Sequence, residues 1–210
     1  FNDQKLIAIA QVICVRAKRG SYYFIPYGPV TKNGEIDDKL LEEITQFLAN
    51  RAKKEKIDFI RISPFIKNTK QNKAIFSKNG YSDAPMHTLA ETTWLLDLTK
   101  PEDEILIEMR KTNRNLIRKA AKLGVEVHKK TSSEAAEEFV KIHKDTKKKH
   151  NFTPYPDEFF KNQVKIFSKT DSVSVFLAKY NDIVISSAIV MHYGNMAAYH
   201  HGASLLEYKK

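Results

Sequence analysis

The sequence predicts a layered α/β fold that is built twice. Segments with helical periodicity alternate with short apolar segments typical of buried strands along the 210 residues. A pattern of turn residues and strands near the beginning of the chain recurs near its end. The composition, 42% hydrophobic with 7 glycines and 7 prolines, is that of an ordinary globular protein.

Turn residues divide the first half of the chain into short apolar segments and one strongly periodic helix. Asp37 has the residue type and position of a helix N-cap, and apolar residues follow it at helical spacing. Gly20 marks the turn between the first two strands. The expected elements are strands at residues 6–15, 22–26, 57–62 and 94–98, the helix that begins after Asp37, and a short helix at residues 72–78.

The second half of the chain is expected to form helices followed by a three-stranded meander. Pro101 suits the first turn of a helix, and Gly124 ends that helix. Asn181-Asp182 and Gly194-Asn195 are typical of tight turns between antiparallel strands. The expected elements are helices at residues 101–123, 133–149 and 157–168, and strands at residues 125–128, 172–180, 183–193 and 196–201.

The two ends of the chain match each other at three places, in the same order. The matches are Asn2-Asp3 with Asn181-Asp182, 179 residues later, then Gly20 with Gly194 and Tyr27-Gly28-Pro29 with His201-Gly202-Ala203, each 174 residues later. Apolar strands separate the matches in both halves. The pattern therefore predicts a tandem duplication, with the chain beginning inside the first copy and ending at the corresponding point of the second.

Lysine and arginine outnumber aspartate and glutamate by 35 to 25, a formal net charge of +10. This excess favours anionic partners such as phosphates, nucleic acid or an acidic membrane face, and better solubility alone is the alternative. The longest apolar segment, residues 6–15, is too short to span a bilayer. The single cysteine, Cys14, is expected to be a small core residue in a reducing compartment. Because the chain opens at Phe1 rather than Met, a targeting segment upstream is left open.

One predicted helix carries a cationic flank. Its cations are Arg110, Arg114, Arg118 and Lys122 at four-residue spacing, with Lys111 and Lys119 beside them. No acidic residue occurs from residue 109 to residue 124. Like charges at this spacing repel each other in an isolated helix, so a partner of opposite charge is expected. We interpret the cationic flank as a phosphate-binding edge, and a solvated surface is the alternative.

The same helix lies in the segment with the most specific resemblance to a known family. This segment comprises Thr93-Trp94-Leu95-Leu96-Asp97-Leu98, Met109-Arg110-Lys111-Thr112-Asn113-Arg114-Asn115-Leu116-Ile117-Arg118-Lys119-Ala120 and Gly124-Val125-Glu126-Val127. It resembles the stretch that joins the two acyltransferase-like domains of FemABX proteins. Residues 25–30 and 199–204 resemble two further blocks of that family, so the resemblance covers essentially the whole chain.

The resemblance implies two acetyltransferase-like (GNAT-like) domains in tandem, both incomplete in this chain. The order of elements in the second copy, a strand, two helices and a meander, is similar to the GNAT fold. The implied boundaries are residues 1–100 for the C-terminal part of the first domain, 101–124 for a basic helical linker, and 125–210 for the N-terminal part of the second domain.

FemABX proteins move an amino acid from aminoacyl-tRNA to an amine of the peptidoglycan stem peptide, and the resemblance implies this activity. The implied partners are aminoacyl-tRNA, which would contact the cationic flank, and a lipid-linked or UDP-linked muropeptide precursor. No cofactor and no metal are implied. The implied location is cytoplasmic, with a peripheral contact to the inner face of the plasma membrane left open.

On the family pattern, four aromatic or histidine side chains help to line the precursor pocket: Tyr155, Phe159, Tyr199 and His201. Core packing is the alternative for each aromatic ring. No catalytic residue is assigned. The adjacent histidines His200 and His201 do not indicate a metal site, because neighbouring strand residues point to opposite faces.

Two other classes of function compete with aminoacyl transfer. The first is a coenzyme A-dependent small-molecule N-acyltransferase of the GNAT type. Such enzymes cradle a pyrophosphate with a glycine-rich loop at a helix start, whereas residues 28–35 lack that motif and acidic residues, Asp37 among them, begin the helix. The second is a non-enzymatic RNA-binding module, which fits the charge but leaves the duplicated layout unexplained.

Overall fold

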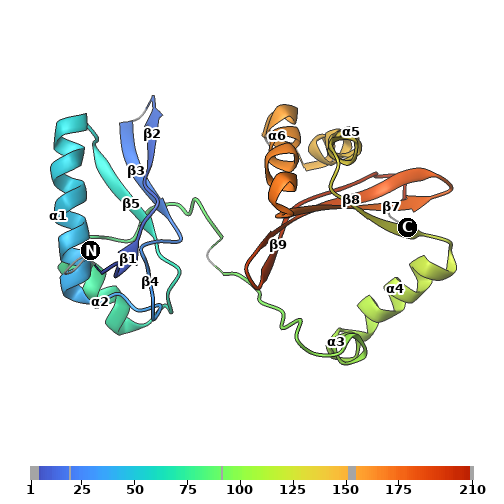
Figure 1. Ribbon diagram of the computed structural model, residues 1–210, viewed down its shortest axis with the longest axis horizontal. Coiled ribbons are helices and arrows are strands. Elements are labelled where there is room, and N and C mark those ends of the chain that lie inside the picture. The colour runs from blue at the N-terminus through green and yellow to red at the C-terminus, as the bar shows by residue number, and fades with distance from the viewer. Residues whose placement is uncertain (1–4, 19, 91, 151–154, 209–210) are drawn as a thin grey trace. The chain divides into compact units, whose positions relative to one another are not determined.

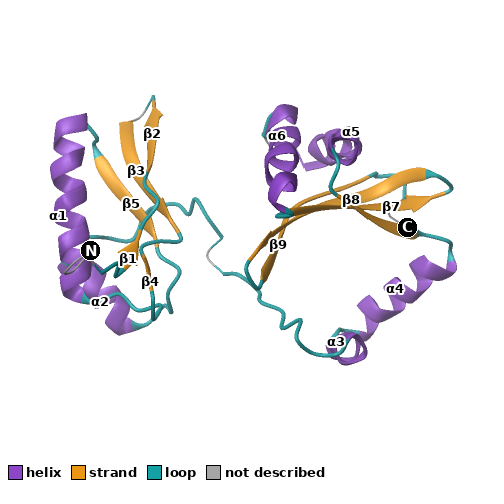
Figure 2. Ribbon diagram, in the orientation of Figure 1, coloured by secondary structure: helices purple, strands orange, loops and turns teal. Residues whose placement is uncertain are grey.

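The computed structural model describes residues 5–18, 20–90, 92–150 and 155–208 (Figure 1). The chain forms two compact units, Phe1–Leu96 (unit 1) and Asp97–Lys210 (unit 2). Both combine helices with small sheets, so the predicted mixture of α and β layers is confirmed (Figure 2). Within the described ranges, no helix is both long enough and apolar enough to cross a membrane. Asn2-Asp3, the first member of the predicted repeat, lies outside these ranges.

Unit 1 contains a three-stranded sheet, a separate two-stranded ladder and two helices. In the sheet, the central strand pairs with an antiparallel strand on one side and a parallel strand on the other. The elements are β1 (Ala8–Ile9) paired with β4 (Val30–Thr31), the sheet β2 (Ile13–Ala17), β3 (Gly20–Pro26) and β5 (Phe59–Ser63) in the order β2-β3-β5, and the helices α1 (Asp38–Glu55) and α2 (Lys70–Lys78).

Helix α1 begins where the sequence predicts and supplies part of the core of unit 1. The Oδ1 atom of Asp37 accepts a hydrogen bond from the backbone N–H of Leu40 at 2.8 Å, which satisfies one of the donors left free at a helix start. The helix ends at Lys56, whose φ of 55° is left-handed. The buried core combines α1 with β3 and the start of the β5 segment: Tyr23, Ile25, Leu48, Ala52 and Ile57.

Three sequence predictions for this part of the chain are wrong. Residues 6–15 do not form one strand, because β1 and β2 pair with different partners, β4 and β3. Residues 94–98 are not a strand: no strand among the described residues pairs with them, and Trp94 is 80% exposed. Cys14 is exposed rather than buried, because it lies on the edge strand β2 while the buried strand residues of the core lie on β3.

Unit 2 contains an antiparallel sheet with two helices on one face (Figure 1). The helices predicted at residues 133–149 and 157–168 and the meander are confirmed, and the sheet order is β6-β7-β8-β9. The elements are β6 (Glu126–Lys130), α5 (Ser133–His150), α6 (Asp157–Phe167), the 3-10 turn η1 (Ser168–Thr170), β7 (Val173–Tyr180), β8 (Ile183–Tyr193) and β9 (Met196–Ser204). The core lies between these helices and the sheet: Ala135, Ala136, Phe139, Val140, Ile142, Phe160, Val164, Val173, Val175, Leu177, Ile189 and Ala203.

Residues 101–124, expected as a linker, fall within unit 2 and form two helices instead of one. Helix α3 (Glu102–Glu108) and helix α4 (Lys111–Lys122) are separated by Met109 and Arg110, whose ψ angles of 151° and 137° are extended. The guanidinium of Arg114 donates hydrogen bonds to the carbonyls of Ile107 (2.6 Å) and Met109. This side chain satisfies carbonyls that a continuous helix would have bonded through its backbone.

The two glycines that the predicted repeat matches, Gly20 and Gly194, both have positive φ (132° and 54°), but Gly20 begins β3 opposite Ala17, whereas Gly194 lies in the turn between β8 and β9. If the hairpins β2–β3 and β8–β9 are aligned by the predicted repeat, their helices lie on opposite faces. The 174-residue offset matches Ile25 with Tyr199. Ile25 is fully buried against α1, whereas Tyr199 is 73% exposed on the face away from α5 and α6.

Candidate functional site

Strand β9 contains a β-bulge that changes which residues face the helices. Ile189 of β8 lies opposite His201, but the next residue of β8 lies opposite Tyr199, so His200 is the extra residue. His200 is 3.0 Å from Gln163 of α6 (Nδ1 to Nε2), and the ring of His201 lies against rings of α5 and α6. Both histidines therefore face the helices. The prediction of opposite faces is wrong because the bulge interrupts the alternation of the strand.

The rings around His201 form the aromatic recess, which we define as Tyr155, Phe159, Phe160 and His201. The imidazole centroid lies 4.9 Å from that of Phe160, 5.9 Å from that of Phe159 and 6.2 Å from that of Tyr155. Tyr155 and Phe159 stack on each other at 4.3 Å. Phe160 is buried and forms the floor, while Tyr155 is 59% exposed and forms the solvent side. Three of the four residues predicted for the precursor pocket therefore lie together.

Two buried polar atoms at the recess have no hydrogen-bond partner within the described ranges: Nε2 of His201 and Oε1 of Gln163. Burial, together with the neighbouring His200 and His143, lowers the pKa of His201 to about 4. Burial also lowers the pKa of His200. The recess is therefore a neutral, aromatic environment with unused hydrogen-bonding capacity. In the described part of the chain, no group of three or more metal-binding side chains could hold a metal ion.

Tyr199, the fourth predicted residue, is not part of the aromatic recess. Its place opposite Val190 puts it on the other face of the sheet. Its ring lies over Gly202, where a Cβ atom would come within 1.8 Å of the Tyr199 hydroxyl. The strand therefore needs glycine beneath this ring in the arrangement observed.

The cations predicted to bind phosphate lie on α4 and at its start, and the structure divides them into two groups. The side chains of Arg110, Lys111, Arg118 and Lys119 are exposed and form no ion pair or hydrogen bond within the described ranges. Arg114 is half-buried and bonded to the carbonyls at the end of α3. These four cations are therefore available to an anionic partner, whereas Arg114 has a structural role.

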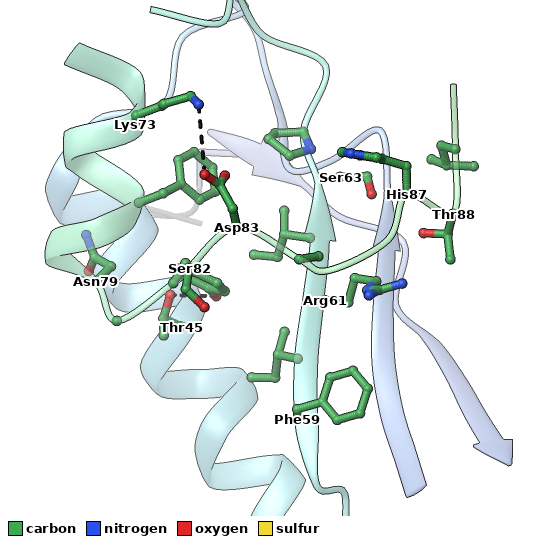
Figure 3. A pocket seen from close by; sticks show the side chains of 18 of the residues that line it. Thr45, Phe59, Arg61, Ser63, Lys73, Asn79, Ser82, Asp83, His87 and Thr88 are labelled. Atoms are coloured by element: carbon green, nitrogen blue, oxygen red, sulfur yellow. Dashed lines mark hydrogen bonds and ion pairs between the residues drawn. The ribbon is translucent and has the colours of Figure 1, made fainter. Parts of the chain in front are cut away.

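Unit 1 contains a cavity of about 1080 Å³ between β5, α1, α2 and residues 80–90 (Figure 3). Both of its carboxylates already have partners. Asp58 accepts a hydrogen bond from the backbone N–H of Ser21 at 2.7 Å, and Asp83 lies 4.0 Å from the ammonium of Lys73, which reaches toward it from α2. The cationic lining residues outnumber the acidic ones: Lys53, Arg61, Lys67 and Lys73 against Asp58 and Asp83. The cavity can hold a polar or anionic ligand.

Sequence reasoning missed this cavity and the role of Gln163. The helices and β5 are each predicted from the sequence, but residues 80–90, which also line the cavity, have no periodic pattern that would place them. Gln163 lies one helical turn after Phe159 and Phe160, so its place beside the recess could have been inferred from helical spacing. The bulge at His200 has no sequence signal that we can identify.

Comparisons with known proteins agree with this architecture. The sequence model of the FemAB family matches residues 80–189, more than half of the chain. The UDP-N-acetylmuramoylpentapeptide-lysine N(6)-alanyltransferase of Weissella viridescens is 27% identical over 186 residues, 85% of this chain and 55% of that enzyme. This chain thus spans about half the length of that relative. A crystal structure of FemX matches with a TM-score of 0.80 and 16% identity, over 100% of this chain and 70% of that chain.

The family match extends from the end of α2 through α5 and α6 to β8, and therefore includes the helical walls of the aromatic recess. The likeness to FemX independently shows that the fold is shared. The chain belongs to the FemAB family.

Proposed function

We propose that the protein containing this chain is an aminoacyltransferase that adds an amino acid to an amine of the peptidoglycan stem peptide, as a step in forming the interpeptide bridge. The observation that carries the proposal is the similarity to the Weissella viridescens alanyltransferase along 85% of this chain. The acceptor is a UDP-linked or lipid-linked muropeptide precursor, and the donor is aminoacyl-tRNA. The proposed reaction needs no cofactor or metal. The proposed location is the cytoplasm, and a peripheral contact with the inner face of the plasma membrane is compatible with it.

The chemistry requires positioning more than it requires a reactive side chain. The acceptor amine attacks the carbonyl carbon of the aminoacyl ester. A C–N amide bond forms, the C–O ester bond breaks, and the departing ribose oxygen takes up a proton that the amine loses. Because the ester is already activated, holding the two substrates together and removing the amine proton supply most of the rate.

The precursor is proposed to occupy the aromatic recess. Tyr155, Phe159 and His201 form one continuous surface there, and Tyr155 is accessible from solvent. Two buried polar atoms next to this surface, Nε2 of His201 and Oε1 of Gln163, have no hydrogen-bond partner within the described ranges. Tyr199 is proposed as a separate substrate contact on the other face of the sheet.

The start of α1 argues against coenzyme A as the donor in unit 1. A pyrophosphate binds a helix start through free backbone N–H groups. Here the Asp37 carboxylate already accepts from the N–H of Leu40, and Asp38 adds a second acid in the first turn. An incoming pyrophosphate would meet negative charge instead of free donors.

The tRNA donor is proposed to contact the exposed cations of α4. Arg110, Lys111, Arg118 and Lys119 have no intramolecular ion pair within the described ranges, so phosphates would not have to displace a carboxylate. Each phosphate contact releases counterions, which makes binding depend on salt concentration. Changing Lys111, Arg118 and Lys119 to Gln should weaken tRNA binding and flatten the double-logarithmic salt dependence by about one unit of slope for each phosphate that is no longer bound. Parallel slopes for the two proteins would exclude α4.

The opposite helix positions of the two units support the proposed tandem of GNAT-like domains. In unit 1 the helices cover one face of the β2–β3 hairpin, and in unit 2 they cover the other face of the corresponding β8–β9 hairpin. A fold that carries helices on both faces of its sheet would show both patterns, one in each partial copy. We propose that the two units are different portions of one repeated domain.

A direct assay separates the donors. The full-length protein is incubated with muropeptide precursor and either a mixture of aminoacyl-tRNAs or acetyl-coenzyme A, and the product is weighed by mass spectrometry. We expect the mass of one or more amino acids to be added with tRNA and no change with acetyl-coenzyme A. Acetylated precursor without an aminoacyl adduct would instead establish the coenzyme A-dependent alternative.

A further inference from the structure

We propose that helix α4 docks on an anionic membrane surface, with its apolar face in the head-group layer and its cations close to the lipid phosphates. Membrane docking goes beyond the proposed reaction, because it assigns a partner to a helix face that the reaction does not use. Three features of unit 2 carry it: an exposed apolar face on α4, uncompensated positive charge around that face, and a helix length that suits lying on a bilayer.

Helix α4 carries one apolar face that the described chain leaves open. The residues of this face are spaced at helical intervals, which places them on one side of the helix: Leu116, Ile117, Ala120 and Leu123. The three larger side chains are 49–58% exposed. On most helices such a stripe is buried against a core. A helix with an open apolar stripe and a strongly cationic remainder has the pattern of helices that lie in a membrane interface.

Exposed cations occupy the rest of the helix surface. Lys119 borders the apolar face, because it lies three residues after Leu116 and four residues before Leu123. The other exposed cations lie on the opposite side: Lys111, Arg118 and Lys122. Attraction between charges reaches about 10 Å at about 0.1 M salt, which is also about the diameter of a helix. Cations on both sides of α4 therefore attract an anionic surface that contacts the apolar face.

The break before α4 keeps its positive charge uncompensated. In a continuous helix, Glu104 and Glu108 would lie seven and three residues before Lys111, on the same side, and would offset its charge. Instead, extended backbone between α3 and α4 separates the acids from the cations, and Glu108 pairs with Lys100. No acidic residue follows until residue 126. Nothing on α4 itself therefore repels an anionic surface.

The chemistry of α4 fits a bilayer better than it fits RNA alone. Phosphates of RNA would engage the cations but would leave the apolar face in water, whereas an anionic bilayer offers both phosphates and acyl chains. The helix has 12 residues and is therefore about 18 Å long, too short to span a hydrocarbon core of about 30 Å (Figure 1). The contact is therefore parallel to the membrane. Lys111 and Arg118 face away from the apolar side and stay available to tRNA.

Vesicle co-sedimentation of the full-length protein tests the docking. The probes are vesicles of phosphatidylglycerol and phosphatidylcholine in equal amounts, and vesicles of phosphatidylcholine alone. Wild type should bind the anionic vesicles more tightly, and added salt should weaken that binding. Leu116→Ser combined with Ile117→Ser should weaken it at least about tenfold, because two apolar side chains no longer leave water. The same variant should bind tRNA as wild type does.

A gain-of-binding variant keeps the test decisive even if the double variant does not fold. Asn113 is exposed and lies four residues before Ile117, so Asn113→Leu extends the apolar face. It should strengthen binding to anionic vesicles about three- to tenfold. Gln46→Leu and Phe47→Ser, at exposed positions of α1 in unit 1, are the matched controls for gaining and losing an apolar side chain, and both should leave vesicle binding unchanged.

Four outcomes would overturn membrane docking. They are no binding of wild type to anionic vesicles, equal binding to both kinds of vesicle, unchanged binding by the double variant and by Asn113→Leu, and equal loss of tRNA and vesicle binding in the double variant. The first would mean that another part of the protein covers the apolar face, and the last that the face binds RNA. Because the donor assay can use soluble UDP-linked precursor without vesicles, each of these results leaves the proposed reaction standing.

Discussion

In unit 1, the β2–β3 hairpin presents Tyr23 and Ile25 to helix α1, whereas in unit 2 the β8–β9 hairpin presents Ile189 and Ala203 to α5 and α6. Strand positions that the predicted repeat matches, such as Ile25 and Tyr199, therefore have opposite environments. The alternation of side chains along a strand is a local property, but which of the two faces becomes the core depends on where the helices pack. A strand's sequence pattern predicts that one face is buried, and the rest of the chain decides which.

The largest expected effect comes from Ile25 and Tyr199, which the predicted 174-residue offset matches. Ile25→Ala should lower the free energy of unfolding of the 210-residue chain by about 2–5 kcal/mol, because it opens a cavity in a closed core. Tyr199→Ala should change it by less than about 0.5 kcal/mol, because the ring is 73% exposed. Urea unfolding followed by circular dichroism measures both. Equal costs at the two positions would show that the units do not differ in the way described.

The start of α1 offers a smaller test. Asp37→Ala should cost about 1 kcal/mol, because the N–H of Leu40 loses its acceptor. Asp37→Asn should retain most of the stability, since its side-chain oxygen can still accept. Helix α6 of unit 2 has Pro156 as its N-cap residue, and no side chain there accepts a hydrogen bond from the helix start. A substitution at Pro156 therefore removes no capping hydrogen bond. The comparison fails if Asn and Ala at position 37 are equally destabilising in thermal unfolding.

The break between α3 and α4 separates a structural arginine from an exposed one. Arg114→Gln should lower stability by about 1 kcal/mol, because the carbonyls of Ile107 and Met109 lose a charged donor that solvent only partly screens. Arg118→Gln, one turn later on the same helix, should stay within about 0.5 kcal/mol. Thermal unfolding of the two variants under one buffer condition measures the difference. If neither variant changes the thermal midpoint, Arg114 does not stabilise the junction between α3 and α4.

Acid should destabilise unit 2 through His201. Its pKa is about 4 in the folded chain and 6.5 when unperturbed, so the unfolded state binds more protons between these values. The stabilising contribution is complete above about pH 6.5 and is lost as the pH falls toward 4. Thermal midpoints measured from about pH 7 to about pH 4 should fall less steeply for His201→Phe than for wild type. Burial also lowers the pKa of His200. Part of the dependence of the thermal midpoint on pH should therefore remain in His201→Phe. Identical slopes would mean that His201 is not buried as described.

Much of the fold follows from local sequence, and the failures share one cause. Asp37, Gly20 and Gly194 act within a few residues, and the elements that they delimit are confirmed. Residues 94–98 have a strand-like composition, but a strand exists only when a partner supplies hydrogen bonds, and composition does not reveal the partner. The split of the predicted helix at Met109 likewise depends on how Arg114 folds back on α3.

The candidate site shows the same limit. The resemblance to FemABX proteins indicated Tyr155, Phe159 and His201, and the structure brings these three together. Tyr199 was predicted with them on the same family pattern, but strand alternation across the bulge places it on the other face of the sheet. Whether these residues bind the precursor stays a prediction.

The extra residue at His200 also affects how this chain should be compared or edited. Beyond the bulge, every position of β9 faces the side that simple counting from Gly194 would assign to its neighbour. Deleting His200 would remove the bulge and leave His201 opposite Ile189, so Ala203 would keep its place in the core, whereas inserting or deleting a residue elsewhere in β9 would turn the rest of the strand over. When this chain is aligned with a relative that lacks the bulge, a gap belongs opposite His200. An alignment without that gap would pair residues from opposite sides of the sheet. Transplanting the recess into a relative means transferring the bulge together with the side chains.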